Sequence, residues 1–414
     1  MSTVKPRPSR PAHHANNNGT RFINPWPSAG APTWAELLQA SFPFGFYKTD
    51  LHTHHKARAV KVVKPDWGAA TLKDRNLDRR KCIISTWLGH AGALIEIPSL
   101  YEADGRSLWL LFDPIFSMRA GPTQYGGVVR AKSSPCQVED LPGCDAIFIS
   151  HNHYDHTDWP TIQAVSKRFP KTKYFVPLGI KQWLTSSGIP DKQIYELDWW
   201  QNREYSPLDF GLQVTSASDE ETILRFSCVP AQHNSGRIVI DQGSTLWCGW
   251  VVERLLRSKD DSAESKATRQ GAVYHAGDTG YRRITRSETV CPAFKEIGER
   301  FGPFDISFVP IWRGGSLGFI SNLGLRLSHD DIPSALHGSP RDAVAIHQDV
   351  RSRNTVGIHF GTFVGSDNET NEAMIEFGQA CDEQGVGDLD DENESDKGRA
   401  GTLDIGGSLA VAIK

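Results

Sequence analysis

The chain has 414 residues, with 45 lysines and arginines against 49 aspartates and glutamates and a formal net charge of −4. This balance provides no broad basic surface, which argues against a general nucleic-acid-binding protein. No apolar run approaches the roughly 18 residues that a membrane-spanning helix requires. Seven scattered cysteines, none of them in a C-x-x-C pair, favour buried thiols in a reducing, intracellular compartment over a disulfide framework.

Residues 1–81 are predicted to form a largely disordered N-terminal arm, because proline, asparagine and basic side chains dominate its composition. Arg21–Pro27, with the sequence RFINPWP, interrupts this composition with three large apolar side chains. Such a cluster favours an anchor that packs onto the folded body or onto a partner. The basic stretch from Lys56 to Lys81 has two interpretations, contact with anionic lipid head groups or a solvated linker.

A compact α/β body is predicted over residues 82–380, because strand-like apolar runs are joined through a helix-like segment at Thr161–Phe169. The predicted strands are Ile83–Leu88, Ala93–Ile97, Ser107–Phe112, Asp145–Ser150, Lys173–Pro177, Leu224–Val229, Thr245–Val252, Gly271–His275, Ile306–Pro310 and Thr355–Phe360. The polar segment Arg254–Gln270 is interpreted as a surface insertion. Residues 381–414 are predicted to hold an acidic linker and a terminal apolar stretch that returns as an edge strand.

The most informative segment is His151-Asn152-His153-Tyr154-Asp155-His156, which directly follows a short apolar strand. In an extended segment the side chains of His151 and His153 point the same way, so two imidazoles can converge on one ion. Asp155 and His156 follow in a turn and offer an oxygen and a nitrogen to a second ion. Imidazole and carboxylate are the ligand set that suits Zn²⁺. The pattern therefore predicts a metal site rather than a chance histidine-rich loop.

Three further candidate ligands, His233, Asp278 and His359, come at or just beyond the ends of later predicted strands. Each of them alone is more often an ordinary polar residue, but together they complete a two-ion site. We expect one ion on His151, His153 and His233, the other on Asp155, His156 and His359, and Asp278 as the bridge between them. Bound zinc lowers the pKa of its water toward about 7, so a hydroxide shared by the two ions would be available as a nucleophile at neutral pH.

The string 151–156 resembles the H-x-H-x-D-H signature of the metallo-β-lactamase superfamily. Additional strings resemble one branch of it, the N-acylphosphatidylethanolamine-hydrolysing phospholipases D. They are RFINPWP at 21–27, TWLGHA at 86–91, DPIF at 113–116, SPC at 134–136, ELDWW at 196–200, AGDTGY at 276–281, the stretch 296–305, and IHFGTF at 358–363. The similarity covers most of residues 82–375 together with the N-terminal anchor.

This resemblance implies a four-layer αββα sandwich with a dinuclear site at one edge of its two sheets. It implies two zinc ions per chain and hydrolysis of N-acylphosphatidylethanolamine to N-acylethanolamine and phosphatidic acid by attack of a metal-bridging hydroxide. The alternative is a hydrolase of the same fold that acts on another phosphodiester, a lactone or an acyl ester. Members of the branch act on phospholipid at membrane surfaces and tend to form dimers. The resemblance therefore implies peripheral association with an internal membrane, cytoplasmic or mitochondrial, and a homodimer.

The resemblance also implies roles for individual side chains. Asp155 and Asp278 are expected to take part in catalysis as well as in metal binding, and His329 is expected to take part in catalysis as well as in substrate binding. His329 falls where the branch has a histidine near the substrate head group, and it is expected to bind substrate together with Tyr154; the alternative for His329 is a neighbour of a helix cap. The segment 311–327 is longer than its counterpart and differs from it in composition, which bears on substrate preference.

Two more interpretations concern residues near the predicted strands. Asp113 follows the strand at 107–112 and is expected to hold a metal-ligating histidine from behind, a role that metal sites commonly require. The aromatic pair Trp199-Trp200 is typical of a core, and the alternative is a contact with the interface of a bilayer.

Overall fold

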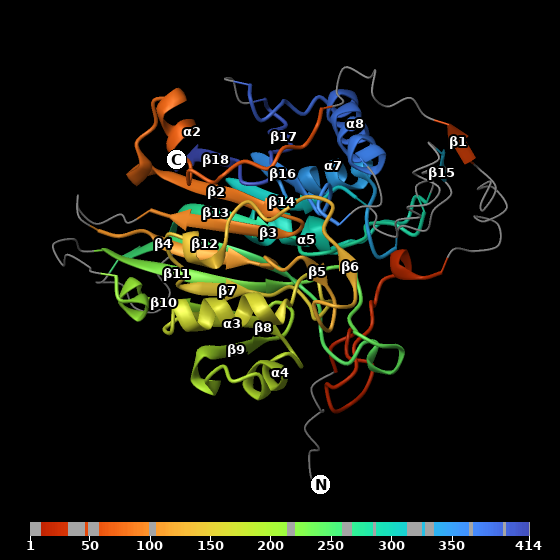
Figure 1. Ribbon diagram of the computed structural model, residues 1–414, viewed down its shortest axis with the longest axis horizontal. Coiled ribbons are helices and arrows are strands. Elements are labelled where there is room, and N and C mark those ends of the chain that lie inside the picture. Colours follow the sequence, from red (N-terminus) through yellow and green to blue (C-terminus); the bar gives the residue numbers. More distant parts are fainter. Residues whose placement is uncertain are drawn as a thin grey trace, which may run out of the picture.

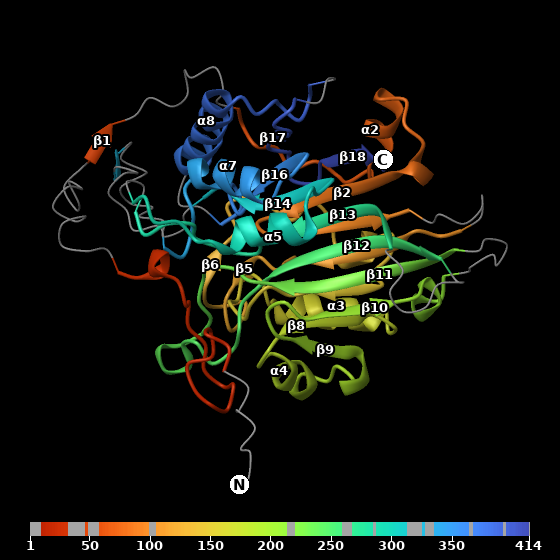
Figure 2. The same ribbon diagram turned by 180° about the vertical axis from the view of Figure 1, so that it is seen from behind.

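The computed structural model describes residues 10–31, 46–48, 58–98, 105–212, 220–258, 267–284, 287–312, 325–327, 335–363, 367–391 and 395–413. In this part of the chain, two seven-stranded sheets pack face to face and helices cover their outer faces (Figures 1 and 2). The αββα sandwich that the sequence predicts is therefore confirmed. Of the helices described, none is both long enough and apolar enough to span a bilayer.

The first sheet has the strand order β18-β2-β3-β4-β7-β8-β9. Its strands are β2 (Cys82–Gly89), β3 (Gly92–Ile97), β4 (Leu108–Phe112), β7 (Ala146–Phe148), β8 (Lys173–Pro177), β9 (Ile194–Leu197) and β18 (Ser408–Ala412). The strands from β18 to β4 pair antiparallel, and those from β4 to β9 pair parallel. The apolar C-terminal stretch thus forms one edge of this sheet.

The second sheet has the order β10-β11-β12-β13-β14-β16-β17. Its strands are β10 (Asn202–Tyr205), β11 (Glu220–Val229), β12 (Gly249–Ser258), β13 (Thr268–His275), β14 (Ile306–Pro310), β16 (Asn354–Ile358) and β17 (Arg399–Gly401). The interpretation of Arg254–Gln270 as an insertion is wrong at both of its ends, because β12 and β13 continue through them. Leu255 is buried and pairs with Arg269, so pairing and burial outweigh the polar composition of this segment.

Helices cover the outer face of each sheet. α3 (Trp159–Arg168) and α4 (Lys181–Ser186) share an apolar cluster with the outer side of the first sheet. α5 (Ala293–Phe301), α7 (Pro340–Asp349) and α8 (Asp367–Gln384) contribute apolar side chains that pack against the second sheet. The remaining α-helix and strands of the described chain are α2 (Ala69–Asp74) beside β18 and two short strand pairs, β1 (Phe46–Lys48) with β15 (Leu325–Leu327) and β5 (Arg119–Ala120) with β6 (Val128–Val129).

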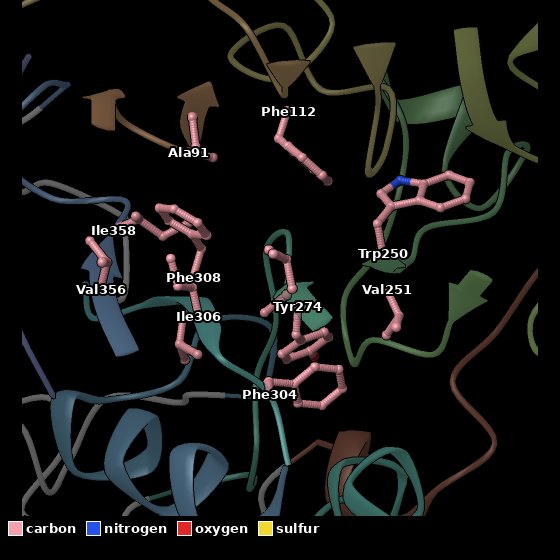
Figure 3. Packing of buried hydrophobic residues seen from close by; sticks show 14 of the residues in the cluster. Ala91, Phe112, Trp250, Val251, Tyr274, Phe304, Ile306, Phe308, Val356 and Ile358 are labelled. Atoms are coloured by element: carbon pink, nitrogen blue, oxygen red, sulfur yellow. The ribbon is translucent and has the colours of Figure 1, made fainter. Parts of the chain in front are cut away.

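The core between the sheets is dominated by aromatic rings, and Figure 3 shows part of it. Phe112, Phe148 and Phe175 form a stacked row on adjacent strands of the first sheet, with ring centroids 4.7 and 5.0 Å apart. Phe148 meets Phe226 and Trp250 of the second sheet edge to face, at 5.1 and 5.4 Å. A buried phenylalanine contributes about 3–5 kcal/mol relative to alanine. This row therefore fixes how the two sheets, and the loops at their ends, are placed relative to each other.

The anchor RFINPWP packs on the folded body. Phe22 is buried and its amide donates to the carbonyl of Gly243 at 2.9 Å. Trp26 stacks on Trp199 with centroids 5.3 Å apart, and His13 stacks on the same ring at 4.2 Å. Because Trp199 is buried beneath the arm, its interpretation as a bilayer contact is wrong. The guanidinium of Arg300 makes a cation–π contact with the ring of the neighbouring Trp200, 4.2 Å from its centroid.

The folded body begins earlier in the chain than Cys82. Val60 and Leu72 are buried, and α2 packs beside β18. The arm itself is fastened by His13 and His14, whose Nε2 atoms lie 2.6 and 2.8 Å from the two carboxylate oxygens of Asp198. Each imidazole donates to a different carboxylate oxygen of Asp198, so hydrogen bonds alone satisfy this carboxylate.

Candidate metal centre

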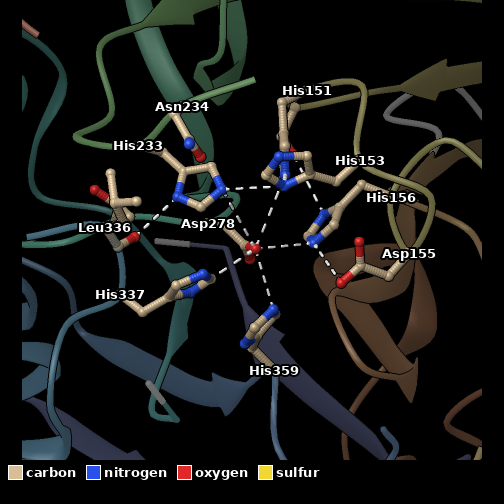
Figure 4. A network of polar contacts seen from close by, with 12 residues as sticks. His151, His153, Asp155, His156, His233, Asn234, Asp278, Leu336, His337 and His359 are labelled. Atoms are coloured by element: carbon tan, nitrogen blue, oxygen red, sulfur yellow. Dashed lines mark hydrogen bonds and ion pairs between the residues drawn. The ribbon is translucent and has the colours of Figure 1, made fainter. Parts of the chain in front are cut away.

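The predicted ligands meet at one edge of the sandwich because the strands that precede them run in the same direction. β4 and β7 pair parallel, as do β13, β14 and β16. In α/β sheets, the loops after the carboxyl ends of parallel strands gather at one edge, where ligands bind. The loops after β7, β11, β13 and β16 supply the seven predicted metal ligands, which converge as Figure 4 shows.

The structure brings these side chains into two groups that correspond to the two predicted ion sites. The ligand atoms of His151, His153 and His233 all lie within 4.8 Å of one another. A second group meets the same limit and consists of Asp155, His156 and His359 with one further residue, His90.

Asp278 lies between the two groups, as the bridging role predicts. Its Oδ2 atom is 3.1 Å from the Nε2 atoms of both His156 and His359. The same oxygen lies 3.8 Å from Nε2 of His233 and 3.9 Å from Nε2 of His151. One carboxylate oxygen thus faces ligands from both groups.

The residues present fit a pair of cations. Several buried ligand atoms have no hydrogen-bond partner: Nε2 of His156, Nε2 of His359 and Oδ1 of Asp278. A buried polar atom without a partner is costly unless a ligand satisfies it. Three carboxylates, those of Asp113, Asp155 and Asp278, also surround the imidazole of His156 within 3.8 Å. Such a concentration of buried negative charge is stable when cations compensate it.

The imidazoles differ in how the surroundings shift their pKa values. Burial holds the pKa of His151 and of His233 well below the ordinary value, so both rings are neutral and their lone pairs are available. Burial would also lower the pKa of His156, but the carboxylates of Asp278, Asp155 and Asp113 outweigh it and raise that pKa well above the ordinary value. Burial opposes ionisation of Asp278, yet His156 and His359 keep its pKa well below the ordinary value. The carboxylate of Asp278 is therefore charged.

Hydrogen bonds behind the centre orient the ligand nitrogens. Nδ1 of His156 lies 2.9 Å from Oδ2 of Asp113 and donates to it, which leaves Nε2 to face the centre. Nδ1 of His233 donates to the carbonyl of Leu336 at 2.9 Å, with the same consequence. This orientation by a second partner is usual for metal-ligating histidines. Asp113 thus contacts a predicted ligand from behind, as expected.

The N-terminal arm reaches the same ligand. The amide of Asn24 donates to the carbonyl of His233 at 2.7 Å, and its oxygen accepts from the indole of Trp247 at 3.2 Å. Packing of the arm therefore contributes to the position of a predicted metal ligand.

Backbone strain is concentrated at this edge. Seven non-glycine residues of the described chain have a positive φ, and three of them are His90 (51°), Asp113 (36°) and His359 (66°). A left-handed conformation is unfavourable for a side chain with a Cβ atom, and it persists where the surroundings fix it. Here the amide of His359 donates to the carbonyl of His90 at 2.9 Å, and the amide of His90 donates to Oγ1 of Thr362 at 2.7 Å.

Sequence reasoning missed two histidines of the centre. Nε2 of His90 lies 2.9 Å from Oδ2 of Asp155, and Nδ1 of His337 lies 3.9 Å from Oδ2 of Asp278 with no hydrogen-bond partner. His90 could have been found from the sequence, because its turn follows the strand β2. This strand runs parallel to β4 and so ends at the edge where the predicted ligands lie. His337 had only a weak signal, since the described residues directly before it, 335 and 336, are not part of a strand.

The two residues predicted to bind substrate have different outcomes. Tyr154 lies on the metal loop between His153 and Asp155, where its half-buried ring contacts the guanidinium of Arg237 at 4.6 Å. His329 lies outside the described residues, as does most of the segment 311–327.

We expect Asp113→Asn to weaken metal binding at this edge by about 10- to 100-fold, the usual effect of removing a partner behind a ligand. The carboxylate accepts from Nδ1 of His156 and, through both oxygens, from Ser150, so the neutral amide no longer compensates these donors. Metal release to a competing chelator measures the change. Asp305→Asn is the matched control, because Asp305 is a buried acceptor before β14, at the opposite end of the sheet. Equal metal affinity in the two variants would contradict the role of Asp113.

Comparison with known proteins agrees with this geometry. Residues 108–360 match the model of the beta-lactamase superfamily domain. The chain is 32 % identical over 284 residues to N-acyl-phosphatidylethanolamine-hydrolyzing phospholipase D 1 of Caenorhabditis elegans, covering 68 % of this chain and 64 % of that protein. It is 28 % identical over 343 residues to the mitochondrial N-acyl-phosphatidylethanolamine-hydrolyzing phospholipase D of Saccharomyces cerevisiae, covering 75 % and 60 %. The chain thus spans less than two thirds of the length of either relative.

Among solved structures, the metallo hydrolase Igni18 of Ignicoccus hospitalis is 17 % identical with a TM-score of 0.45, covering 80 % of this chain and all of that one. The family match covers the strands and loops that carry all seven predicted ligands. The chain therefore belongs to the metallo-β-lactamase superfamily, and its relatives include proteins named N-acyl-phosphatidylethanolamine-hydrolyzing phospholipase D.

Proposed function

We propose that the protein is a zinc-dependent phosphodiesterase that hydrolyses N-acylphosphatidylethanolamine to N-acylethanolamine and phosphatidic acid. The observation that carries the proposal is the convergence of the six other predicted ligands around Asp278, in a chain whose relatives are named for this reaction. The imidazole and carboxylate donor set supports zinc at both positions.

One ion would be held by His151, His153 and His233, the other by Asp155, His156 and His359, and both by Asp278. When bound, a pair of divalent ions polarises a phosphoryl group and lowers the pKa of water, so that hydrolysis proceeds at neutral pH. In this reaction the bond between phosphorus and the ethanolamine oxygen breaks and a water oxygen joins phosphorus. The proton of the water goes to the leaving ethanolamine oxygen.

The other side chains at the centre have separate roles in this proposal. Asp155 accepts from His90, and this bond fixes the carboxylate where it can orient the attacking water. The unpartnered Nδ1 of His337 lies 3.9 Å from Oδ2 of Asp278, and the ligand atom of His337 is within 4.8 Å of those of His233 and Asp278. The proposal leaves His337 outside both ion sets and assigns it to donate to a phosphoryl oxygen of the substrate. The arm restrains His233 through Asn24.

The test is product analysis with purified protein in water enriched in ¹⁸O. N-acylphosphatidylethanolamine in detergent micelles is expected to give N-acylethanolamine, with the heavy oxygen in the phosphatidic acid. The metal content is expected to be about two zinc ions per chain. Protein that contains zinc but leaves this lipid intact would refute the proposed substrate.

A second candidate is a hydrolase of another phosphodiester, a lactone or an acyl ester, and the composition of segment 311–327 is the observation that favours it. A panel of bis-p-nitrophenyl phosphate, lactones and acyl esters separates the candidates. Turnover of one of these, without release of N-acylethanolamine, would favour the second candidate.

We also propose that the protein works at the surface of an internal membrane, because its substrate would lie in a bilayer. The name of the yeast relative supports mitochondria as the location. Fractionation of cells that express a tagged chain tests this location. The expected homodimer is tested by light scattering on the purified protein.

A further inference from the structure

Large apolar side chains are exposed in one region of the described chain. Ten are exposed in total, and all but Leu208 belong to segments that are part of the metal loop, residues 151–159, or are hydrogen-bonded to it or to the predicted ligand His233. These nine are Ile23, Met118, Tyr125, Val128, Val129, Trp159, Ile238, Val239 and Ile240, and we refer to them as the apolar rim. Monomeric proteins expose apolar side chains singly, whereas a cluster of them marks an interaction site.

The turn that carries Ile238, Val239 and Ile240 is attached to the metal loop at its base. The guanidinium of Arg237 donates to the carbonyls of Asn152 and Thr157, at 2.7 and 3.0 Å. Val239, at the tip, is 90 % exposed. The most exposed aliphatic side chain of the rim is therefore carried by a turn that is hydrogen-bonded to the metal loop.

The hairpin of β5 and β6 is attached to the other side of the same loop. The hydroxyl of Ser117 donates to Oδ2 of Asp158 at 2.7 Å, and the amide of Phe116 donates to Oγ1 of Thr161 at 2.9 Å. Tyr125, between the two strands, is 97 % exposed. Both ribbon views place β5 and β6 at the same end of the molecule as the N-terminal arm (Figures 1 and 2). The rim thus borders the metal centre on more than one side.

Two arginines beside the rim form no ion pair among the described residues, and one carboxylate there, that of Asp241, accepts from the amides of Arg237 and Ile238. Residues 10–31, 114–138 and 229–240 contain no aspartate or glutamate. The guanidinium groups of Arg21 and Arg119 donate to neutral backbone carbonyls, those of Gln242 and Gly127. By contrast, Arg58 and Arg79 of the basic stretch 56–81 pair with Asp404 and Glu96, so that stretch offers less free positive charge.

We propose that the apolar rim is the surface by which this protein docks on an anionic lipid bilayer. Apolar tips with uncompensated arginines beside them match a membrane surface, where acyl chains lie behind negative head groups. A bilayer is the occupant that the position favours, because docking there brings a head group to the metal centre while the acyl chains stay in the membrane. The inference rests on the proposed function and names the surface through which that site meets its substrate.

The test is co-sedimentation of the full chain with vesicles of phosphatidylcholine that contain about one third phosphatidylglycerol. The double variant Val239→Asp/Ile240→Asp is expected to bind at least about tenfold more weakly than the wild type, because two inserted side chains become charged. Leu208→Asp is the matched control, an exposed apolar residue outside the rim that is expected to leave binding unchanged. Binding of the wild type is expected to weaken at high salt and on pure phosphatidylcholine.

Equal sedimentation of the double variant and the wild type would overturn the proposal. The proposal would also be overturned if the wild type did not bind vesicles but formed a dimer that the double variant does not form. The rim would then bind a second copy of the chain. Hydrolysis of lipid in detergent micelles, where no bilayer is needed, is expected to be the same in both. Absence of hydrolysis in micelles would refute the proposed function, whereas loss of vesicle binding alone concerns the rim.

Discussion

Asp278→Asn is expected to lower kcat by about 10³-fold, the upper range for removing a charged or polar group that acts directly on the transition state. Oδ2 of Asp278 is 3.1 Å from nitrogens of both His156 and His359, and the nitrogens of His151 and His233 lie within 4 Å of it. A neutral amide removes one negative charge from between the two groups. We therefore expect the metal content to fall together with the turnover.

Metal analysis and the rate of lipid hydrolysis on the same preparation measure this effect. Asp305→Asn serves again as the control, because it replaces a buried carboxylate far from the ligand edge and tests whether an isosteric change alone impairs the fold. A preparation of Asp278→Asn with full metal content and wild-type turnover would exclude a bridging role.

His337→Ala is expected to lower kcat by about 10²- to 10³-fold while the metal content stays near that of the wild type. The ring belongs to neither ion set, yet its buried Nδ1 lies 3.9 Å from Oδ2 of Asp278 and has no partner. In the proposed function this ring acts on the substrate, and because its ligand atom also lies within 4.8 Å of those of His233 and Asp278, the metal content decides between the two roles. Steady-state kinetics and metal analysis together measure the two effects.

Two conservative variants sharpen this test, because they differ in which ring nitrogen they imitate. The amide nitrogen of asparagine reaches about as far as Nδ1, whereas that of glutamine reaches about as far as Nε2. His337→Asn is expected to retain more activity than His337→Gln. If metal is lost with either variant, His337 is a ligand. His329→Ala in the same assay tests the residue that the sequence favours for this role.

Much of the fold could be predicted from the sequence because apolar periodicity is a local property. The strands expected at Lys173–Pro177 and Ile306–Pro310 have the predicted bounds. The ends of β12 and β13, at Arg254–Ser258 and Thr268–Gln270, could not be predicted. Their polar composition is typical of a loop, and they form strands because they pair with each other. Local composition reports burial well and strand pairing poorly.

The sequence by itself determined which side chains are available to the candidate site: the spacing of His151–His156 predicts a metal loop, and His233, Asp278 and His359 follow strands. Only the tertiary structure decided which other groups join them. The direction of β2 brings His90 to the centre, and the loop before α7 brings His337 there. Neither effect produces a periodic pattern in the sequence. The position of the arm, the burial of Trp199 and the gathering of the apolar rim likewise depend on contacts between segments far apart in the chain. Such contacts are set by packing in three dimensions, which no short stretch of residues encodes.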